Sequence, residues 1–311
     1  MISIKQRIDE IRSSLQPLLK SEARASVLQN HVPDAELFIG ISGIEYKQDS
    51  FEIIPGFLTI RSITNPPGIV HVCRASNLDQ SDYLGVARYS HTIKAEITCG
   101  KQSFQILDDP QFFHDLAWNT AALIKLRGHQ TLVGYCSSTV SWDTVQAITD
   151  HSVLFLILDD VPRQLQVDDI RCVSSQDLIW VRENYNRALR LRDASESRRF
   201  GLAFNLAYTW NHTSNSRIAV ANIWSGLEAL FGVQTDRPVS QMLVERIAAW
   251  LNGVSESEIG DLYNHRCDAV HGRLMQEDEI IDVIRKSADL LRRSLVQCIE
   301  RDEKTLPDWG A

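Results

Sequence analysis

The sequence lacks the short signatures of the common nucleotide-binding and hydrolase sites. It contains no Walker-type phosphate loop, no G-x-G-x-x-G dinucleotide fingerprint and no G-x-S-x-G nucleophile elbow. It also lacks a long hydrophobic run, because its most apolar stretch, 153–158, is far shorter than the roughly 20 residues that a membrane helix needs. The N-terminus alternates polar and apolar residues and has no apolar signal-peptide core. We therefore expect a soluble, cytoplasmic protein with no membrane partner.

Metal-binding and disulfide patterns are absent as well. The six cysteines are scattered, without a C-x-x-C pair or zinc-like spacing, which favours reduced thiols over a disulfide framework. Acidic doublets occur at 108–109, 159–160 and 168–169, and the second follows an apolar run, where strand-end carboxylates hold Mg²⁺ in some enzymes. Turn-forming aspartates are much commoner at such places, and no cluster of histidine or glutamate stands nearby. We predict no metal site and no cofactor.

Negative charge exceeds positive charge, with 40 aspartate and glutamate residues against 32 lysine and arginine residues. The formal net charge of −8 argues against a protein that binds nucleic acids over its whole surface, although it leaves room for a local basic track. One arginine-rich segment, interleaved with aromatic residues, provides a candidate track along an RNA backbone. Its RNA-contacting candidates are Arg187, Arg190, Arg198 and Arg199. Acidic residues within the same segment leave a second interpretation open, in which it is an ordinary solvated face.

The patterns that are present indicate an α+β fold in two domains. With 311 residues, 44% of them hydrophobic, the chain is long enough to bury substantial cores. Residues 3–30 show the apolar spacing of an amphipathic helix. Apolar runs between turn residues then predict strands at 51–54, 57–63, 69–73, 83–89, 92–98, 103–107, 131–136 and 152–158, and helices at 110–126 and from 141. We assign residues 1–165 to this mixed N-terminal domain.

After Pro162 the strand signals stop, and the remaining chain is predicted to be helical. Apolar spacing with serine starts and glycine stops indicates helices at 177–193, 196–212, 216–231, 238–251, 256–271 and 277–303. We assign residues 172–305 to an all-α domain.

The stretch 262–272 holds the most unusual side chains of this domain. On a helix, Arg266 falls within an apolar face, where a guanidinium is costly unless it is paired or lines a wet cleft. His271 precedes the stop signal Gly272 and is expected at the helix C-terminus. The two residues suit metal-free RNA cleavage, in which histidine moves the protons and arginine stabilises the phosphate charge. For an isolated pair, the favoured interpretation is an arginine and a histidine that cap helix-end carbonyls.

Geometry limits the first interpretation. On a regular helix the two positions are about 140° apart, so they would not meet over one phosphate. A frayed last turn or a two-fold dimer would be needed to bring them together. A possible partner for Arg266 is Glu228, which sits at the edge of the apolar face of the predicted helix 216–231, and we expect the two to form an ion pair.

Together these two segments resemble the Apea-like branch of HEPN domains. The first reads Trp-x-x-Leu-Glu-Ala-Leu-Phe from Trp224 to Phe231, and about thirty residues later Leu-Tyr-x-x-Arg-x-x-x-Val-His-Gly spans Leu262 to Gly272. The resemblance covers about residues 175–305. It implies an all-α bundle that dimerises with its Arg/His motifs facing each other. For many members it also implies a metal-independent endoribonuclease of toxin–antitoxin or antiphage systems.

The resemblance also implies roles for individual residues. His271 is the expected general acid/base, Arg266 the phosphate stabiliser and Glu228 the group that orients Arg266, with Tyr263 and Asp268 in support. The expected partners are an RNA substrate, a second copy of the chain, and an antitoxin or phage-derived trigger. By analogy the N-terminal domain is a sensing or regulatory module. The alternative is a non-catalytic HEPN dimerisation or binding module, with a structural arginine and histidine and a ligand- or partner-sensing N-terminal domain.

Overall fold

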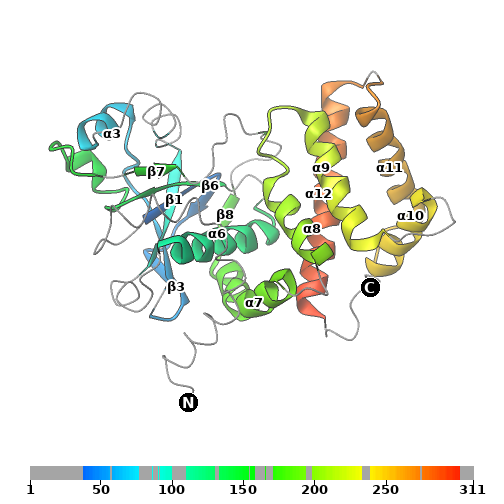
Figure 1. The fold of residues 1–311 in the computed structure, drawn as a ribbon, viewed down its shortest axis with the longest axis horizontal. Helices are drawn as coiled ribbons and strands as arrows, with labels where there is room; N and C mark the ends of the chain where they lie inside the picture. The colour runs from blue at the N-terminus through cyan, green and yellow to red at the C-terminus, as the bar shows by residue number, and fades with distance from the viewer. Residues whose placement is uncertain are drawn as a thin grey trace, which may run out of the picture. The chain divides into compact units, whose positions relative to one another are not determined.

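The fold is α+β, with a sheet-containing part followed by a helical part (Figure 1). The computed structural model describes residues 38–56, 58–76, 86, 90, 92–99, 110–129, 133–153, 155–157, 165, 171–193, 198–232, 239–273 and 275–301. The chain divides into two compact units. Unit 1 comprises Met1–Lys125, His129–Pro162 and Asp168–Tyr185. Unit 2 comprises Leu126–Gly128, Arg163–Val167 and Asn186–Ala311. The predicted helix 3–30, the predicted strand 103–107 and nearly all of the predicted strand 83–89 lie outside the described residues.

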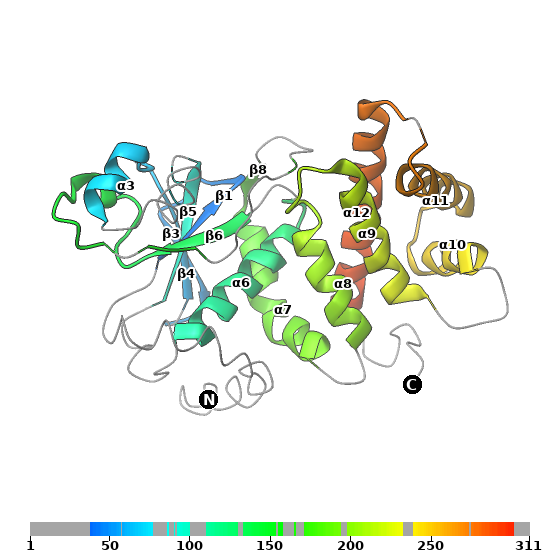
Figure 2. The same cartoon turned by 45° about the horizontal axis from the view of Figure 1, so that its top comes forward.

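Unit 1 is built on a six-stranded sheet in the order β3-β4-β5-β1-β6-β7, with every neighbouring pair antiparallel. Its strands are β1 (Phe38–Ser42), β3 (Ser50–Ile54), β4 (Leu58–Ser62), β5 (Ile93–Cys99), β6 (Val133–Ser138) and β7 (Phe155–Ile157). β1 lies inside the sheet between β5 and β6 (Figure 2). All five of its residues are buried. A strand covered on both faces tends to be apolar throughout, and here only Ser42 is polar.

Trp142 is the anchor of the core on one side of this sheet. Its side chain is fully buried, and its indole N–H donates to the carbonyl oxygen of Phe38 at 2.9 Å. Glycine at position 40 makes room for the ring, because a Cβ there would lie 3.0 Å from the indole and 2.6 Å from Ile93 Cδ1. Trp142 therefore belongs to the core, and the predicted helix start around it is reduced to a turn and the short 3₁₀ helix η2 (Val145–Ala147).

A buried carboxylate joins the sheet to the same turn. Glu96 on β5 is fully buried and accepts hydrogen bonds from the backbone N–H of Trp142 at 2.9 Å and the hydroxyl of Ser141 at 3.1 Å. The guanidinium of Arg61 pairs with the same carboxylate. Burial raises the pKa of Glu96, and these bonds and the Arg61 charge oppose the rise.

Two further predictions for unit 1 are wrong. The segment predicted as a strand at 69–73 is a helix, α3 (Ile69–Ala75), because a helix places Val72 and Ala75, three positions apart, in the core. Strand structure also continues beyond residue 162. The strand β8 (Arg171–Val173) pairs in parallel with β2 (Ile44–Tyr46) in a separate two-stranded sheet. Three residues are too few to show the alternation by which a strand is recognised.

The remaining helices agree with the predicted spans. α6 (Pro110–Leu126) and α9 (Ser216–Phe231) have the predicted bounds. The other ends lie within three residues of prediction in α7 (Ser175–Asp193), α8 (Arg198–Thr209), α10 (Val239–Trp250), α11 (Glu256–Val270) and α12 (Glu277–Glu300). α7 runs through the division between the two units, since unit 1 ends at Tyr185 and unit 2 resumes at Asn186.

In unit 2, α9 is the central helix and packs against α8, α10, α11 and α12 (Figures 1 and 2). Its buried face includes Ile223, Trp224 and Leu227, each with no exposed surface. Gly226 lets α12 approach closely, because a Cβ at this position would lie 2.9 Å from a methyl carbon of Leu291. One face of α9 is therefore fixed on α12, and another part of the same helix meets α11.

Candidate functional site at the ends of α9 and α11

The helix that holds the predicted site, α11, has a defined start. Ser255 is its N-cap, and the hydroxyl of Ser255 accepts from the backbone N–H of Glu258 at 3.2 Å. The carboxylate of Glu258 in turn accepts from the backbone N–H and the hydroxyl of Ser255, each at 2.9 Å. These bonds form a capping box, and they lower the pKa of Glu258.

The end of α11 is equally well defined. His271 is its C-cap, and Gly272 follows with a φ of +76°, a left-handed conformation that favours glycine. The backbone N–H of Arg273 donates to Asp268 O at 3.0 Å, and that of Gly272 donates to Ala269 O at 3.4 Å. This pair of bonds is a Schellman motif, which ends the helix at a fixed residue. The predicted place of His271 at the helix C-terminus is confirmed.

The predicted ion pair between α11 and α9 is present. Arg266 Nη2 lies 2.9 Å from Glu228 Oε1, with 20% of the arginine side chain and 33% of the glutamate side chain exposed. The pair is thus half-buried, with a route to solvent for both charges. Arg266 Nε is buried and, among the described residues, makes no hydrogen bond. The pairing accounts for most of the cost of placing a guanidinium on this face.

The aromatic ring of Tyr263 packs against the Arg266 guanidinium. The Arg266 guanidinium carbon lies 5.4 Å from the centre of the Tyr263 ring, a cation–π distance. The same ring meets Trp224 edge to face at 5.4 Å, and the Trp224 indole N–H donates to the Ser287 hydroxyl at 3.0 Å. Burial raises the pKa of the Tyr263 hydroxyl, although the positive charge of Arg266 works against the rise. Tyr263 therefore connects the ion pair to the core of unit 2.

The structure separates two of the other predicted residues from this pair. Asp268 forms an ion pair with Arg273 at 2.6 Å, where it closes the turn after α11. His271 is exposed, and its backbone N–H still donates to Cys267 O at 2.9 Å, as in a regular helix. The last turn is therefore not frayed, and the separation of about 140° between Arg266 and His271 around the helix axis holds. Within one chain the two side chains leave α11 on different sides.

Arg217, which the sequence did not single out, contacts the turn that contains His271. From the first turn of α9, Arg217 Nη1 donates to Ala269 O at 2.6 Å and Nη2 donates to Arg273 O at 2.9 Å. Both acceptors are backbone atoms, so no side-chain pattern in the sequence marks them. Only the antiparallel pairing of α9 and α11 would have revealed the contact.

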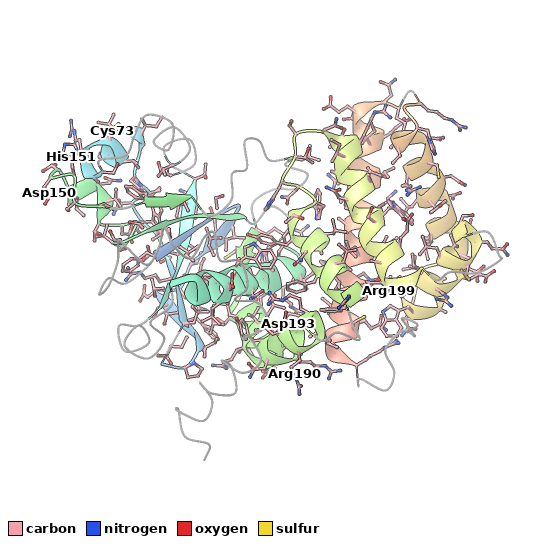
Figure 3. The ribbon with its side chains drawn as sticks, in the orientation of Figure 1. Cys73, Asp150, His151, Arg190, Asp193 and Arg199 are labelled. Carbon is pink, nitrogen blue, oxygen red and sulfur yellow. The ribbon has the colours of Figure 1, made fainter. Side chains whose placement is uncertain are left out.

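The predicted RNA-contacting arginines do not share one environment. Arg190 and Arg198 are exposed, whereas Arg187 is half-buried, with two guanidinium nitrogens out of contact with solvent. Arg199, labelled on α8 in Figure 3, donates to the carbonyl oxygen of Gly232 at the end of α9. Trp180 is largely buried, so its ring does not form an exposed stacking platform for bases.

Several arginines of unit 2 cap helix C-termini. Besides Arg199 and Arg217, Arg246 donates to Phe231 O at 3.1 Å, and Arg293 donates to Asn252 O at 2.9 Å just after α10. Cationic side chains are favoured at this end of a helix by its dipole. Much of the arginine content of this unit therefore has a structural reason.

No family model, no curated protein and no solved structure matches the chain.

In the part of the chain that the structure describes, no group of three or more histidine, cysteine, aspartate and glutamate side chains is placed to hold a metal ion. Over the same residues, no helix combines the length and the apolar character of a membrane span.

Proposed function

We propose that unit 2 is a HEPN-type domain and that the protein is a metal-independent endoribonuclease. The observation that carries this proposal is the half-buried ion pair between Arg266 on α11 and Glu228 on α9. Five residues after Arg266, the exposed His271 lies at the well-defined end of α11. The family resemblance adds a toxin or antiphage defence role in the cytoplasm. It also adds an antitoxin or phage-derived trigger as a partner and a sensing role for the N-terminal domain.

The proposed reaction needs one base, one acid and one cation at the phosphate. The RNA 2′-oxygen loses its proton, attacks the adjacent phosphorus and displaces the 5′-oxygen of the next nucleotide, which takes up a proton. The products are a 2′,3′-cyclic phosphate and a 5′-hydroxyl. His271 serves as the general acid/base, and Arg266 stabilises the charge on the phosphate. Glu228 orients Arg266 through the ion pair, and the Tyr263 ring packs against the guanidinium. Asp268 supports the turn after α11 through its ion pair with Arg273.

A second copy of the chain completes the site in this proposal. Because Arg266 and His271 of one chain point away from each other, a phosphate between them requires the arginine of one protomer and the histidine of its partner. The surface beside the turn suits such a contact, since Ile218 on α9 and Val270 on α11 are 49% and 43% exposed. Arg190 and Arg198, both exposed, remain the candidates for contacts to the RNA backbone.

The test is cleavage of total RNA in the presence of EDTA by the full chain and by His271→Ala and Arg266→Ala variants. We expect the wild type to form cyclic-phosphate ends, and each variant to lose at least about 100-fold in rate. Arg293→Met is a control, because it removes an arginine–carbonyl bond just after α10 and is not among the residues proposed for the site. Unchanged cleavage by both site variants, or a strict requirement for Mg²⁺, would contradict the proposal.

A second candidate function is a non-catalytic HEPN module for dimerisation and binding. Arg266 favours it in one respect, because the side chain is 20% exposed, is held by Glu228 and has a buried Nε. A side chain of this kind also serves as a purely structural link between α9 and α11. In that case wild-type protein and the His271→Ala variant would leave RNA equally intact.

A further inference from the structure

α9 contacts the end of α11 at two separate points. Glu228 holds Arg266, and Arg217 holds the turn around His271. The two contact residues are eleven positions apart on α9, which is about 16 Å of helix at roughly 1.5 Å per residue. Because the low-numbered end of α9 meets the high-numbered end of α11, the helices run antiparallel. A single rigid helix therefore carries one anchor for each of the two predicted catalytic side chains.

The contact made by Arg217 differs from an ordinary helix cap. One of its acceptors, Ala269 O, belongs to the last turn of α11, but the other, Arg273 O, lies beyond the helix end. The two bonded carbonyls flank His271 and Gly272 in the chain. Arg217 thus fixes both the entry and the exit of the turn on which His271 is placed.

Arg217 adds a side-chain restraint to the two backbone bonds that close this turn. Gly272 has no atom within 4 Å of the position that a Cβ would occupy, so packing around it does not fix the backbone. The Asp268–Arg273 ion pair is a surface contact, with 76% of the arginine side chain exposed, and such pairs contribute little. The bonds from Arg217 are charge-assisted, and bonds of this class are about twice as strong as neutral ones. The bond to Ala269 O is partly buried, whereas the bond to Arg273 O is exposed.

We propose that Arg217 is a positioning residue for His271. It holds the turn that contains His271 on α9, the helix that also holds Arg266 through Glu228. This inference rests on the proposed ribonuclease function and assigns to it a residue outside the Arg/His motif. Arg217 acts through the backbone at 269–273 and does not touch the RNA. A displacement of about 1 Å at a catalytic group costs up to roughly 100-fold in rate, so the loss of the contact should be visible in turnover.

The experiment compares three variants of the full chain. Arg217→Met removes both bonds, Arg217→Lys keeps the charge but presents a single donor group, and Arg293→Met removes a comparable arginine–carbonyl bond at the end of α10. For Arg217→Met we expect a rate at saturating RNA lower by about 10- to 100-fold, with KM changed by less than about threefold. Arg217→Lys should recover part of the rate, and Arg293→Met should cleave like the wild type.

A second measurement separates positioning from folding. Each variant is checked by circular dichroism, and the ring ¹H–¹⁵N signals of His271 and the amide exchange of Arg273 are recorded. We expect both probes to change in Arg217→Met and to stay unchanged in Arg293→Met. Wild-type-like turnover by Arg217→Met would overturn the role of Arg217 alone. Absence of cleavage by the wild type would overturn the ribonuclease proposal, and the catalytic part of this inference with it.

Discussion

At the residue scale, the place of Arg266 depends on a single carboxylate. Glu228 contributes the one charge that faces the guanidinium at ion-pair distance among the described residues. Replacing a buried partner commonly costs 3–5 kcal/mol, but here both side chains retain solvent contact, so solvent screening reduces the figure. For Glu228→Gln we expect a loss of about 1 kcal/mol in the free energy of unfolding, measured by urea denaturation.

The same substitution should affect cleavage more than stability. A neutral amide orients Arg266 less well, so the rate should fall by about 10-fold or more under the ribonuclease proposal. The matched control is Glu245→Gln on α10, where the side chain accepts a hydrogen bond from Gln241 at 3.0 Å and the amide oxygen can replace it. If Glu228→Gln lost stability but kept its full rate, Glu228 would be a structural partner only.

At the element scale, α11 presents its site residues because both of its ends are fixed. The capping box at Ser255 is independent of the proposed chemistry, and its removal tests how much the helix start contributes. For Ser255→Ala we expect a loss of about 1 kcal/mol in unfolding free energy. Ser257→Ala is the control, since Ser257 is an exposed residue of the same turn that is not the N-cap.

The capping effect should also depend on pH. The bonds from Ser255 lower the pKa of Glu258 below its ordinary value of 4.5. A carboxyl group with a lowered folded-state pKa contributes stability above its ordinary value and loses it as pH falls through the folded-state value. The difference in unfolding free energy between wild type and Ser255→Ala should therefore shrink below pH 4.5. The backbone N–H of residue 255 still bonds to Glu258 in the variant, so a difference that stayed constant down to pH 2 would show that the bond from the Ser255 hydroxyl to the Glu258 carboxylate has no part in the cap.

The helices could be predicted because their signals are local. Ser255 and Gly272 mark the ends of α11, and their capping chemistry involves residues within three or four positions. The sheet was harder to predict from the sequence, because its strand pairings join segments that are far apart in the chain. The segment now seen as α3 was predicted as a strand from an apolar run that follows turn residues, and the packing of Val72 and Ala75 in the core decided otherwise.

The candidate site was predictable to the same extent. Arg266 on an apolar face requires a partner, and the edge position of Glu228 on its own helix made it the natural candidate. Arg217 could not be found in this way, because its acceptors are the backbone carbonyls of Ala269 and Arg273. Every residue has such a carbonyl, so its use becomes visible only when the helices are placed side by side.

At the scale of the whole molecule, the ribonuclease proposal requires two chains. Ile218 is a suitable position to test this, because it is 49% exposed and lies in the first turn of α9. Aspartate is favoured in the first turn of a helix, so Ile218→Asp should disrupt an apolar contact without unfolding the helix. We expect the wild type to sediment as a dimer at micromolar concentration, and Ile218→Asp to sediment as a monomer with greatly reduced cleavage.

Leu202→Asp is the matched control, since Leu202 is 53% exposed on α8 and is not part of the surface beside His271. A complementation experiment then tests the shared site directly. In a mixed dimer of Arg266→Ala and His271→Ala chains, one of the two sites combines an intact arginine with an intact histidine from the partner. Random mixing makes half of the dimers mixed, so about a quarter of wild-type activity should return. If each site used its arginine and histidine from one chain, no intact site would form and no activity would return.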